Sequence, residues 1–269
     1  MANFKLLISY KGTHFNGWQI QPNKQTIQGM IEKTVFDIFG EKARVVGSGR
    51  TDAGAHANGQ VANIRLTRNI TSIQLMNALN SKLPSDIRVK HAEIVDKSFH
   101  ARFDAVGKTY MYCFYNSRTG NALIDEYSYQ IPYEINLKRM QEAGNLLIGE
   151  HDFSSFCGKG SMTESNIRRI DELTFMKTGK IIVMTTTGNG FLYKMVRTIA
   201  GTLLEVGRGK LPPDIISELL THKDREKGGP TAKAKGLSLL SVYYDKDEMK
   251  RSIEEQKNKK QLDTIVSLL

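Results

Sequence analysis

One acidic residue, Asp52, lies in a glycine-rich segment in which the other charged or titratable side chains are basic. The segment reads Gly47-Ser48-Gly49-Arg50-Thr51-Asp52-Ala53-Gly54-Ala55-His56-Ala57. Arg50 precedes the carboxylate by two positions, and His56 follows it by four. Glycine allows positive φ and a close approach of the backbone to a ligand. The segment therefore predicts a loop that presents Asp52 as a nucleophile or base to an anionic polymer.

Asp52 and His56 also have purely structural interpretations. Aspartate in a glycine-rich turn commonly forms an Asx-turn or caps a helix, and such a role would leave Asp52 without chemistry. The six histidines of the chain show no metal-ligand spacing, so a structural role is the better interpretation of His56. Both interpretations of Asp52 are open on these residues alone.

A second candidate, Arg197, ends the segment Phe191-Leu192-Tyr193-Lys194-Met195-Val196-Arg197. On a helix it would lie beside Tyr193 and Gly201, which are four positions away on either side. A buried arginine needs an acidic partner, and Asp52 could be that partner if both residues faced one cleft. The alternative is a surface arginine, which the lysine three positions earlier favours.

The composition favours a polyanionic partner and chemistry without a cofactor. The formal net charge is +10 over 269 residues, and each phosphate that a basic protein neutralises releases counterions. A basic protein with no such partner is the alternative. Cys113 and Cys157 build neither a disulfide framework nor a CxxC motif, and the GxGxxG, GxxxxGK[ST] and HExxH patterns are absent. We therefore expect no metal and no cofactor.

The first residues, Met1-Ala2-Asn3-Phe4-Lys5, lead directly into a strand-like pattern. No apolar run is long enough to cross a bilayer, and no signal peptide is recognisable. We expect a cytoplasmic location.

The elements that must position Asp52 follow from apolar periodicity. In the first half, strands are predicted over residues 4–10, 43–46, 62–66 and 87–95, and helices over 27–38 and 73–83. The second helix is preceded by a capping box, Thr71-Ser72-Ile73-Gln74. The order β-α-β-β-α-β is typical of a ferredoxin-like unit.

The second half repeats this order. Strands are predicted over 109–115, 173–176, 181–187 and 237–244, and helices over 137–147, 192–203 and from 212 onwards, where Pro212 and Pro213 suit a helix start. We expect an α+β fold of two ferredoxin-like halves that form a continuous, mostly antiparallel sheet, with helices on one face and a cleft on the other. The expected domains are 1–105, which carries the Asp52 loop, 106–245, and a charged tail over 246–269.

Several segments, in order along nearly the whole chain, resemble the TruA family of tRNA pseudouridine synthases. The stretch Gly49-Arg50-Thr51-Asp52-Ala53-Gly54-Ala55-His56-Ala57 is similar to the catalytic loop of the family, which has valine where this chain has Ala55. The other matching segments are Tyr10-Lys11-Gly12, Phe15-Asn16-Gly17-Trp18-Gln19, Phe99-His100-Ala101-Arg102-Phe103, Lys108-Thr109-Tyr110-Met111-Tyr112, His151-Asp152-Phe153, Phe191 to Arg197 and Gly236-Leu237.

The resemblance implies a role for each matching residue. Asp52 matches the catalytic aspartate, and Arg197 the arginine that keeps this carboxylate ionised. Arg50 matches a residue that holds the RNA backbone and the flipped-out base, Tyr110 one that packs on the base near C5, and Leu237 one that covers the uracil. From the residue pattern alone Tyr110 and Leu237 would be ordinary core residues, and Trp18 could be either a core anchor or an exposed RNA-stacking side chain.

The resemblance further implies isomerisation of uridine to pseudouridine at positions 38 to 40 in the anticodon stem-loop of tRNA, without cofactor or metal, by a homodimer with an RNA-binding cleft. The chain departs from the family at Lys233, where proline is frequent, and at Lys108, where arginine is common. A noncatalytic RNA-binding protein is the alternative, because ferredoxin-like sheets also build RNA-recognition modules. A phosphate-ester hydrolase is disfavoured, because no second carboxylate accompanies Asp52 as a metal ligand.

Overall fold

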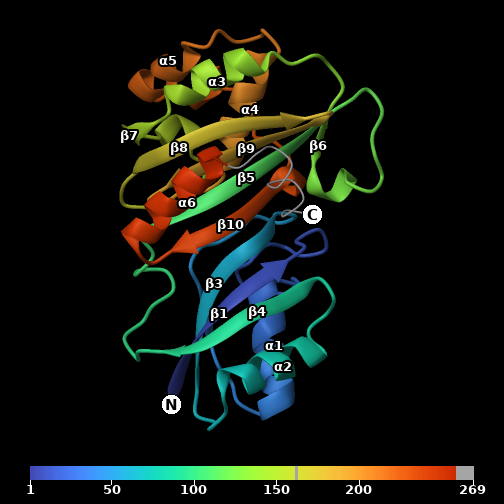
Figure 1. Cartoon of the computed structure of the whole chain (residues 1–269), viewed down its shortest axis with the longest axis vertical. Coiled ribbons are helices and arrows are strands. Elements are labelled where there is room, and N and C mark those ends of the chain that lie inside the picture. The colour runs from blue at the N-terminus through green and yellow to red at the C-terminus, as the bar shows by residue number, and fades with distance from the viewer. Residues whose placement is uncertain (161–162, 259–269) are drawn as a thin grey trace. The chain divides into compact units, whose positions relative to one another are not determined.

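The computed structural model describes residues 1–160 and 163–258 and divides the chain into two compact units (Figure 1). The first unit contains Met1–Val106 and Ser238–Tyr244, and the second contains Gly107–Leu237 and the chain from Asp245 onwards. The expected boundary at residue 105 lies next to the observed one. The segment 238–244, however, returns to the first unit, because it pairs with a strand there.

The first unit is built around strand β1 (Ala2–Tyr10), which is antiparallel to both β3 (His56–Leu66) and β4 (Ile87–Val95). The short strand β2 (Val45–Gly47) is antiparallel to β3, and β10 (Leu237–Tyr243) pairs with β3 in parallel through residues 238 and 239. Alternate side chains of β1 are buried, as the period of two in the sequence predicts.

Two capped helices complete the first unit. Helix α1 (Ile27–Phe39) begins where the Thr26 side chain accepts the Gly29 N–H and ends at Gly40, whose φ of 67° only glycine adopts readily. Helix α2 (Ser72–Lys82) begins with the predicted capping box, in which Thr71 and Gln74 bond reciprocally. Helix α2 packs on β4, and α1 packs on α2 and β2.

The sheet of the second unit has the order β5-β9-β8-β7, and all neighbours are antiparallel. Its strands are β5 (Gly107–Asn116), β7 (Gly149–Asp152), β8 (Ile167–Thr178) and β9 (Ile181–Gly188), and β6 (Tyr129–Ile131) adds to β5 in parallel. Strands β6 and β7 were not among the predicted elements, because three or four residues are too few to show a period.

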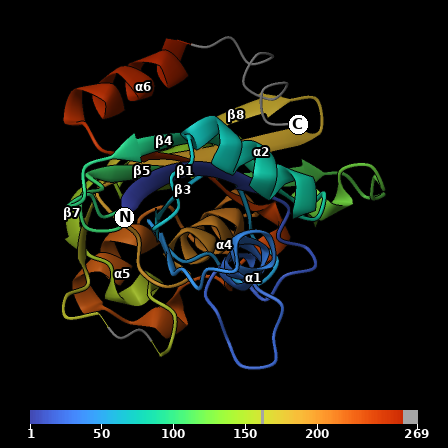
Figure 2. The ribbon, with the colours of Figure 1, turned by 90° about the horizontal axis from the view of Figure 1, so that it is seen from below.

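Helix α3 (Leu137–Asn145) packs on both α4 (Met195–Gly207) and α5 (Ile215–His222), and α3 and α4 also contact β8 and β5 respectively. Four short 3₁₀ turns lie in the connections: η1 (Asp125–Tyr127), η2 (Ser154–Phe156), η3 (Arg225–Lys227) and η4 (Ala234–Gly236). Figure 2 shows α6 (Lys246–Asn258) on the opposite side of β5 and β8 from α4 and α5.

Helix α4 begins three residues later than predicted. Lys194 adopts φ of 60° at the N-cap, so Leu192 and Tyr193 lie in the preceding turn and not on the helix. The expected charged tail is in part packed, because Met249 of α6 is buried; residues 259–269 lie outside the described residues. The α+β class with mostly antiparallel pairing is confirmed. None of the described helices is long and apolar enough to cross a membrane.

Candidate active site

The Asp52 loop is the connection between β2 and β3, two strands that pair with each other. The Ser48 N–H donates to the Val61 carbonyl at 2.7 Å, which marks the point where the chain leaves the ladder. The Gln60 side chain is fully buried under the loop. It accepts from Ser48 Oγ at 2.7 Å and donates to the Gly49 carbonyl at 3.1 Å. The entry to the loop is therefore tied to β3 by both backbone and side chain.

The residues on either side of Asp52 are held by the N-terminal segment. The Tyr10 hydroxyl and Thr51 Oγ1 are hydrogen-bonded at 2.8 Å, and the Trp18 N–H donates to the Thr51 carbonyl at 3.1 Å. The Ala55 N–H closes a turn on the Asp52 carbonyl at 3.1 Å, and Gly54 takes the positive φ of 78° in that turn. Asp52 itself is half-buried. Its backbone is thus fixed from both sides while its side chain keeps partial access to solvent.

Trp18 is a core anchor beneath the loop. Its exposed fraction is 2%, and a Cβ atom at Gly47 would lie 2.5 Å from its indole ring. Tyr10 packs beside it, with ring centroids 6.0 Å apart. This burial settles the alternative that the sequence left open, because a side chain enclosed by the loop cannot stack on RNA.

Two glycines of the N-terminal segment allow it to touch the loop. A Cβ atom at Gly12 would lie 1.9 Å from the Ala55 carbonyl oxygen, and one at Gly17, where φ is 82°, would lie 2.5 Å from the Thr51 carbonyl oxygen. The Asp52 loop therefore packs against two N-terminal segments that the resemblance singled out. They are Tyr10-Lys11-Gly12 and Phe15-Asn16-Gly17-Trp18-Gln19.

His56 and Arg50 differ in their surroundings. His56 is 5% exposed, and its Nδ1 accepts the Gly12 N–H at 3.1 Å, a structural contact that joins β3 to the N-terminal segment. Arg50 is exposed on the loop, where its guanidinium can meet a large anionic ligand.

Tyr10 and Gln60 were not among the residues predicted for the site, although both hold the loop. Burial raises the pKa of Tyr10 to about 12, against the opposing hydrogen bonds from Thr51 and Gln60. The phenol therefore stays neutral and remains a hydrogen-bonding group at physiological pH. The sequence did offer a clue to Tyr10, because it is the first residue of the matching segment Tyr10-Lys11-Gly12. No sequence motif points to Gln60 as a residue of the site.

Tyr110, Arg197 and Leu237 all lie in the second unit. Tyr110, on β5, is 7% exposed and meets Phe191 edge-on with ring centroids 5.1 Å apart. Arg197 is half-buried in the first turn of α4, and its Nε donates to the Ala232 carbonyl at 2.8 Å. Leu237 is 6% exposed at the start of β10.

The segment that contains Ala232, whose carbonyl accepts the Arg197 hydrogen bond, is held against α4. The Ala232 N–H donates back to the Arg197 carbonyl at 3.0 Å. A Cβ atom at Gly201 would lie 1.7 Å from the Pro230 carbonyl oxygen, so only glycine allows this contact. Thr202 Oγ1 accepts the Gly229 N–H at 3.1 Å. Arg197 is thus positioned by backbone on both sides of the contact, and Gly201 has a packing role.

The predicted residues therefore form two groups. Arg50 and Asp52 share one loop in the first unit, with His56 directly after it at the start of β3, and Tyr110, Arg197 and Leu237 belong to the second unit. Within residues 1–160 and 163–258, no group of three or more His, Cys, Asp and Glu side chains is arranged to hold a metal ion. A half-buried carboxylate on a rigid backbone can act as a nucleophile or a base.

A family model described as tRNA pseudouridine synthase matches residues 6–104 and 143–245. The chain belongs to this family. Asp52, Arg50, Arg197 and Leu237 lie inside the matched ranges, whereas Tyr110 lies between them. The predicted enzyme class, an isomerase, is confirmed by this membership.

Curated bacterial relatives support the assignment over most of the chain. A protein of Bacillus subtilis is 46% identical over 243 residues, which is 90% of this chain and 98% of the relative. A protein of Caldicellulosiruptor saccharolyticus is 46% identical, and one of Acetivibrio thermocellus 42% identical, each over 244 residues and 100% of the relative. All three are named tRNA pseudouridine synthase A.

Proposed function

We propose that this protein converts uridine to pseudouridine at positions 38 to 40 in the anticodon stem-loop of tRNA, with Asp52 as the catalytic carboxylate. The observation that carries the proposal is the loop itself: Asp52 is half-buried between Thr51, held by Tyr10 and Trp18, and the turn closed by Ala55. The family match includes this loop. Pre-organisation of this kind lowers the reorganisation required in the transition state.

The reaction is a rearrangement without net gain or loss of atoms. The C1′–N1 bond of uridine breaks, the freed uracil turns, and C5 bonds to C1′; C5 then loses a proton while N1 gains one. The Asp52 carboxylate starts the sequence, either by forming an adduct with the nucleotide or by initiating glycal formation. No redox partner is needed for this balance.

Each of the other predicted residues also has a proposed role. For Arg197 it is the role that the resemblance implies, an arginine that supports the catalytic carboxylate. Arg50 holds the RNA backbone at the flipped nucleotide, Tyr110 packs on the base near C5, and Leu237 covers the uracil. The target base must leave the stem, which costs a few kcal/mol. We further propose that the enzyme works as a homodimer in the cytoplasm, with the tRNA spanning both subunits.

Release of tritium from C5 tests the role of Asp52. Unmodified tRNA transcripts labelled at uridine C5 should release tritium with the wild-type protein, and Asp52→Asn should lower the rate by at least about 1,000-fold while tRNA still binds. Asp37→Asn, which removes a partly exposed carboxylate from α1, is the matched control and should behave as wild type.

Three outcomes would contradict the proposal. Wild-type protein that binds tRNA without releasing tritium would favour a noncatalytic RNA-binding protein. An Asp52→Asn variant with full activity would remove Asp52 from the mechanism. Transcripts in which uridines 38, 39 and 40 are replaced should release no tritium, and continued release would overturn the assignment of position.

A further inference from the structure

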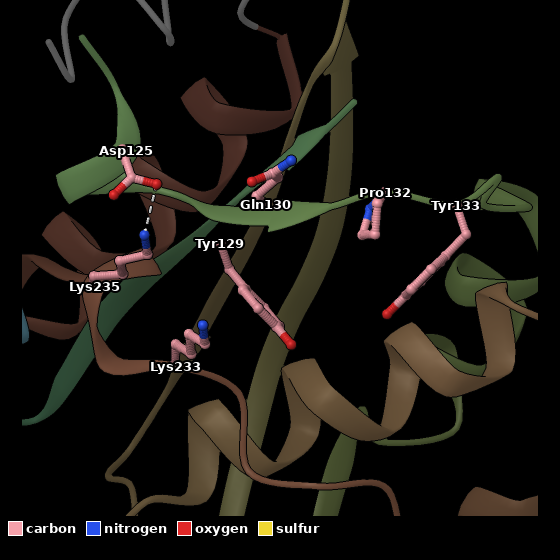
Figure 3. A pocket seen from close by; sticks show the side chains of 7 residues that line it. All are labelled: Asp125, Tyr129, Gln130, Pro132, Tyr133, Lys233 and Lys235. Carbon is pink, nitrogen blue, oxygen red and sulfur yellow. Dashed lines mark hydrogen bonds and ion pairs between the residues drawn. The ribbon is translucent and has the colours of Figure 1, made fainter. Parts of the chain in front are cut away.

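A cavity of about 480 Å³ lies in the second unit, between β6 and the chain that precedes β10 (Figure 3). Its volume falls within the range of about 300–1,000 Å³ common for ligand sites. The lining residues come from two segments, 125–133 and 233–235. They are Asp125, Tyr129, Gln130, Pro132, Tyr133, Lys233 and Lys235.

Lys233 supplies the uncompensated charge of this cavity. Lys235 Nζ is paired with Asp125 at 2.8 Å, so these two charges cancel. Lys233 is exposed, and its Nζ lies 5.6 Å from the ring centroid of Tyr129. Among residues 1–160 and 163–258, Lys233 has no carboxylate partner. The cavity therefore carries a net positive charge that an anion can neutralise.

Tyr129 and Tyr133 supply neutral hydrogen-bond donors. Figure 3 shows both rings on the same side of the β6 segment, with their hydroxyls turned towards each other. The Arg208 guanidinium lies 3.8 Å from the ring centroid of Tyr133 and is itself bonded to Glu205. Burial raises the pKa of Tyr133, so this phenol keeps its proton. Within the described part of the chain, neither hydroxyl is used in a hydrogen bond to protein.

The backbone at Lys233 is fixed before any ligand binds. The Ala232 carbonyl accepts from Arg197 Nε, and the Lys233 carbonyl accepts from the Tyr112 hydroxyl at 2.6 Å. Lys233 adopts φ of −61° and ψ of 143°, a conformation that proline also adopts. Lys233 therefore presents its ammonium group from a backbone that hydrogen bonds within the second unit already hold.

We propose that this cavity binds one phosphodiester of the RNA substrate outside the target nucleotide, with Lys233 as its counter-charge and the Tyr129 and Tyr133 hydroxyls as donors. Two hydroxyls and an ammonium around one opening match the oxygen acceptors of a phosphate. Residues 125–133 lie between the two ranges that the family model matches. The inference rests on the proposed function, because it takes tRNA as the ligand.

Lys233→Pro is the sharpest variant, because it removes the charge and retains the observed backbone conformation. The dissociation constant for unmodified tRNA is measured by fluorescence anisotropy over a series of salt concentrations. Lys233→Pro and Lys233→Gln should weaken binding several-fold, and the slope of log K against log salt should become shallower by about 0.7–0.9. Lys233→Arg should restore the slope. Lys180→Gln, which removes an exposed charge at the β8–β9 turn, is the matched control.

The hydroxyls are tested separately by Tyr129→Phe and Tyr133→Phe. Each variant keeps its ring and should weaken tRNA binding several-fold with an unchanged salt slope, because a neutral donor releases no counterion. Unchanged thermal stability of each variant excludes misfolding as the cause.

Binding and isomerisation are read independently, which separates the two proposals. If wild type isomerises tRNA but the Lys233 variants keep the wild-type affinity and slope, the subsite is wrong and the proposed function stands. If wild type binds tRNA with the predicted Lys233 dependence but never releases tritium, the proposed function fails alone. Lys233-dependent binding of inorganic phosphate or uridine monophosphate, without any effect on tRNA affinity, would identify a free anion as the ligand and overturn the RNA assignment.

Discussion

Tyr10 is the residue on which the geometry of the Asp52 loop depends most directly. Its hydroxyl joins β1 to Thr51, and its ring packs against Trp18 beneath the same loop. Gln60 reaches the Tyr10 hydroxyl at 3.4 Å and the Gly49 carbonyl at 3.1 Å. The backbone on the N-terminal side of Asp52 is thus positioned by neutral side chains.

Tyr10 should also influence stability at alkaline pH. The pKa of Tyr10 is about 12 in the fold, against an ordinary value of 10.0. Between these values the unfolded chain loses the phenol proton and the native state keeps it, so stability falls as pH rises, by roughly 1.4 kcal/mol per pH unit from this group. Urea unfolding at pH 9, 10 and 11 should show a shallower decline for Tyr10→Phe than for wild type. Equal declines would contradict the assignment.

Helix α4 and the segment before β10 form the element pair that carries Arg197. They touch through small residues, and the contact between Gly201 and Pro230 leaves no space for a side chain. The reciprocal bonds between Arg197 and Ala232 depend on this approach. Lys233 follows Ala232 directly in the same segment. The contact between α4 and this segment therefore positions both Arg197 and the proposed RNA subsite.

Gly201→Ala should push helix α4 and the segment before β10 apart. The new Cβ would lie 1.7 Å from the Pro230 carbonyl oxygen, so the segment must shift and carry the Ala232 carbonyl away from Arg197. A displacement of about 1 Å at a catalytic group can lower a rate by about 100-fold, and we expect a loss of at least tenfold in tritium release together with a lower melting temperature. Gly190→Ala, whose Cβ would meet only the Arg168 side chain at 3.7 Å, is the control. Wild-type rates and stability in Gly201→Ala would refute the role of this contact.

At the scale of the whole molecule, the chain extends beyond the family match in helix α6. The match ends at residue 245, and α6 covers Lys246–Asn258. Met249 is 6% exposed, and its Sδ would lie 2.3 Å from a Cβ atom at Gly107. The helix is therefore packed on the start of β5, whereas its charged side chains between residues 246 and 255 are exposed.

Met249→Ala should destabilise the second unit without altering the chemistry. The loss of a buried methionine at the edge of a core costs about 2 kcal/mol, and thermal unfolding should detect it. Tritium release at saturating tRNA should equal that of wild type, because α6 contains none of the predicted site residues. Lys250→Ala, an exposed neighbour, is the matched control. Lost activity at unchanged stability would show instead that α6 takes part in catalysis.

The sequence predicted the first half of the fold well. Its β-α-β-β-α-β order and the capping box at Thr71 follow from residues only a few positions apart. The second half was harder: β6 and β7 are too short to show a period, and Lys194 in a left-handed conformation delays the start of α4. A left-handed lysine is held by its surroundings and leaves no local signal.

The sequence by itself determined the family, the identity of the candidate catalytic residues and most element boundaries, because motifs and apolar periodicity are local properties. Only the tertiary structure decided that Trp18 is buried beneath the loop, that Tyr10 and Gln60 hold it, and that Gly201 admits the segment that bonds Arg197. These contacts join residues between 11 and about 40 positions apart, and their energies come from close packing and from hydrogen bonds that must be satisfied on burial. These packing and hydrogen-bond energies depend on which side chains meet in space. The spacing of residues along the chain does not predict them.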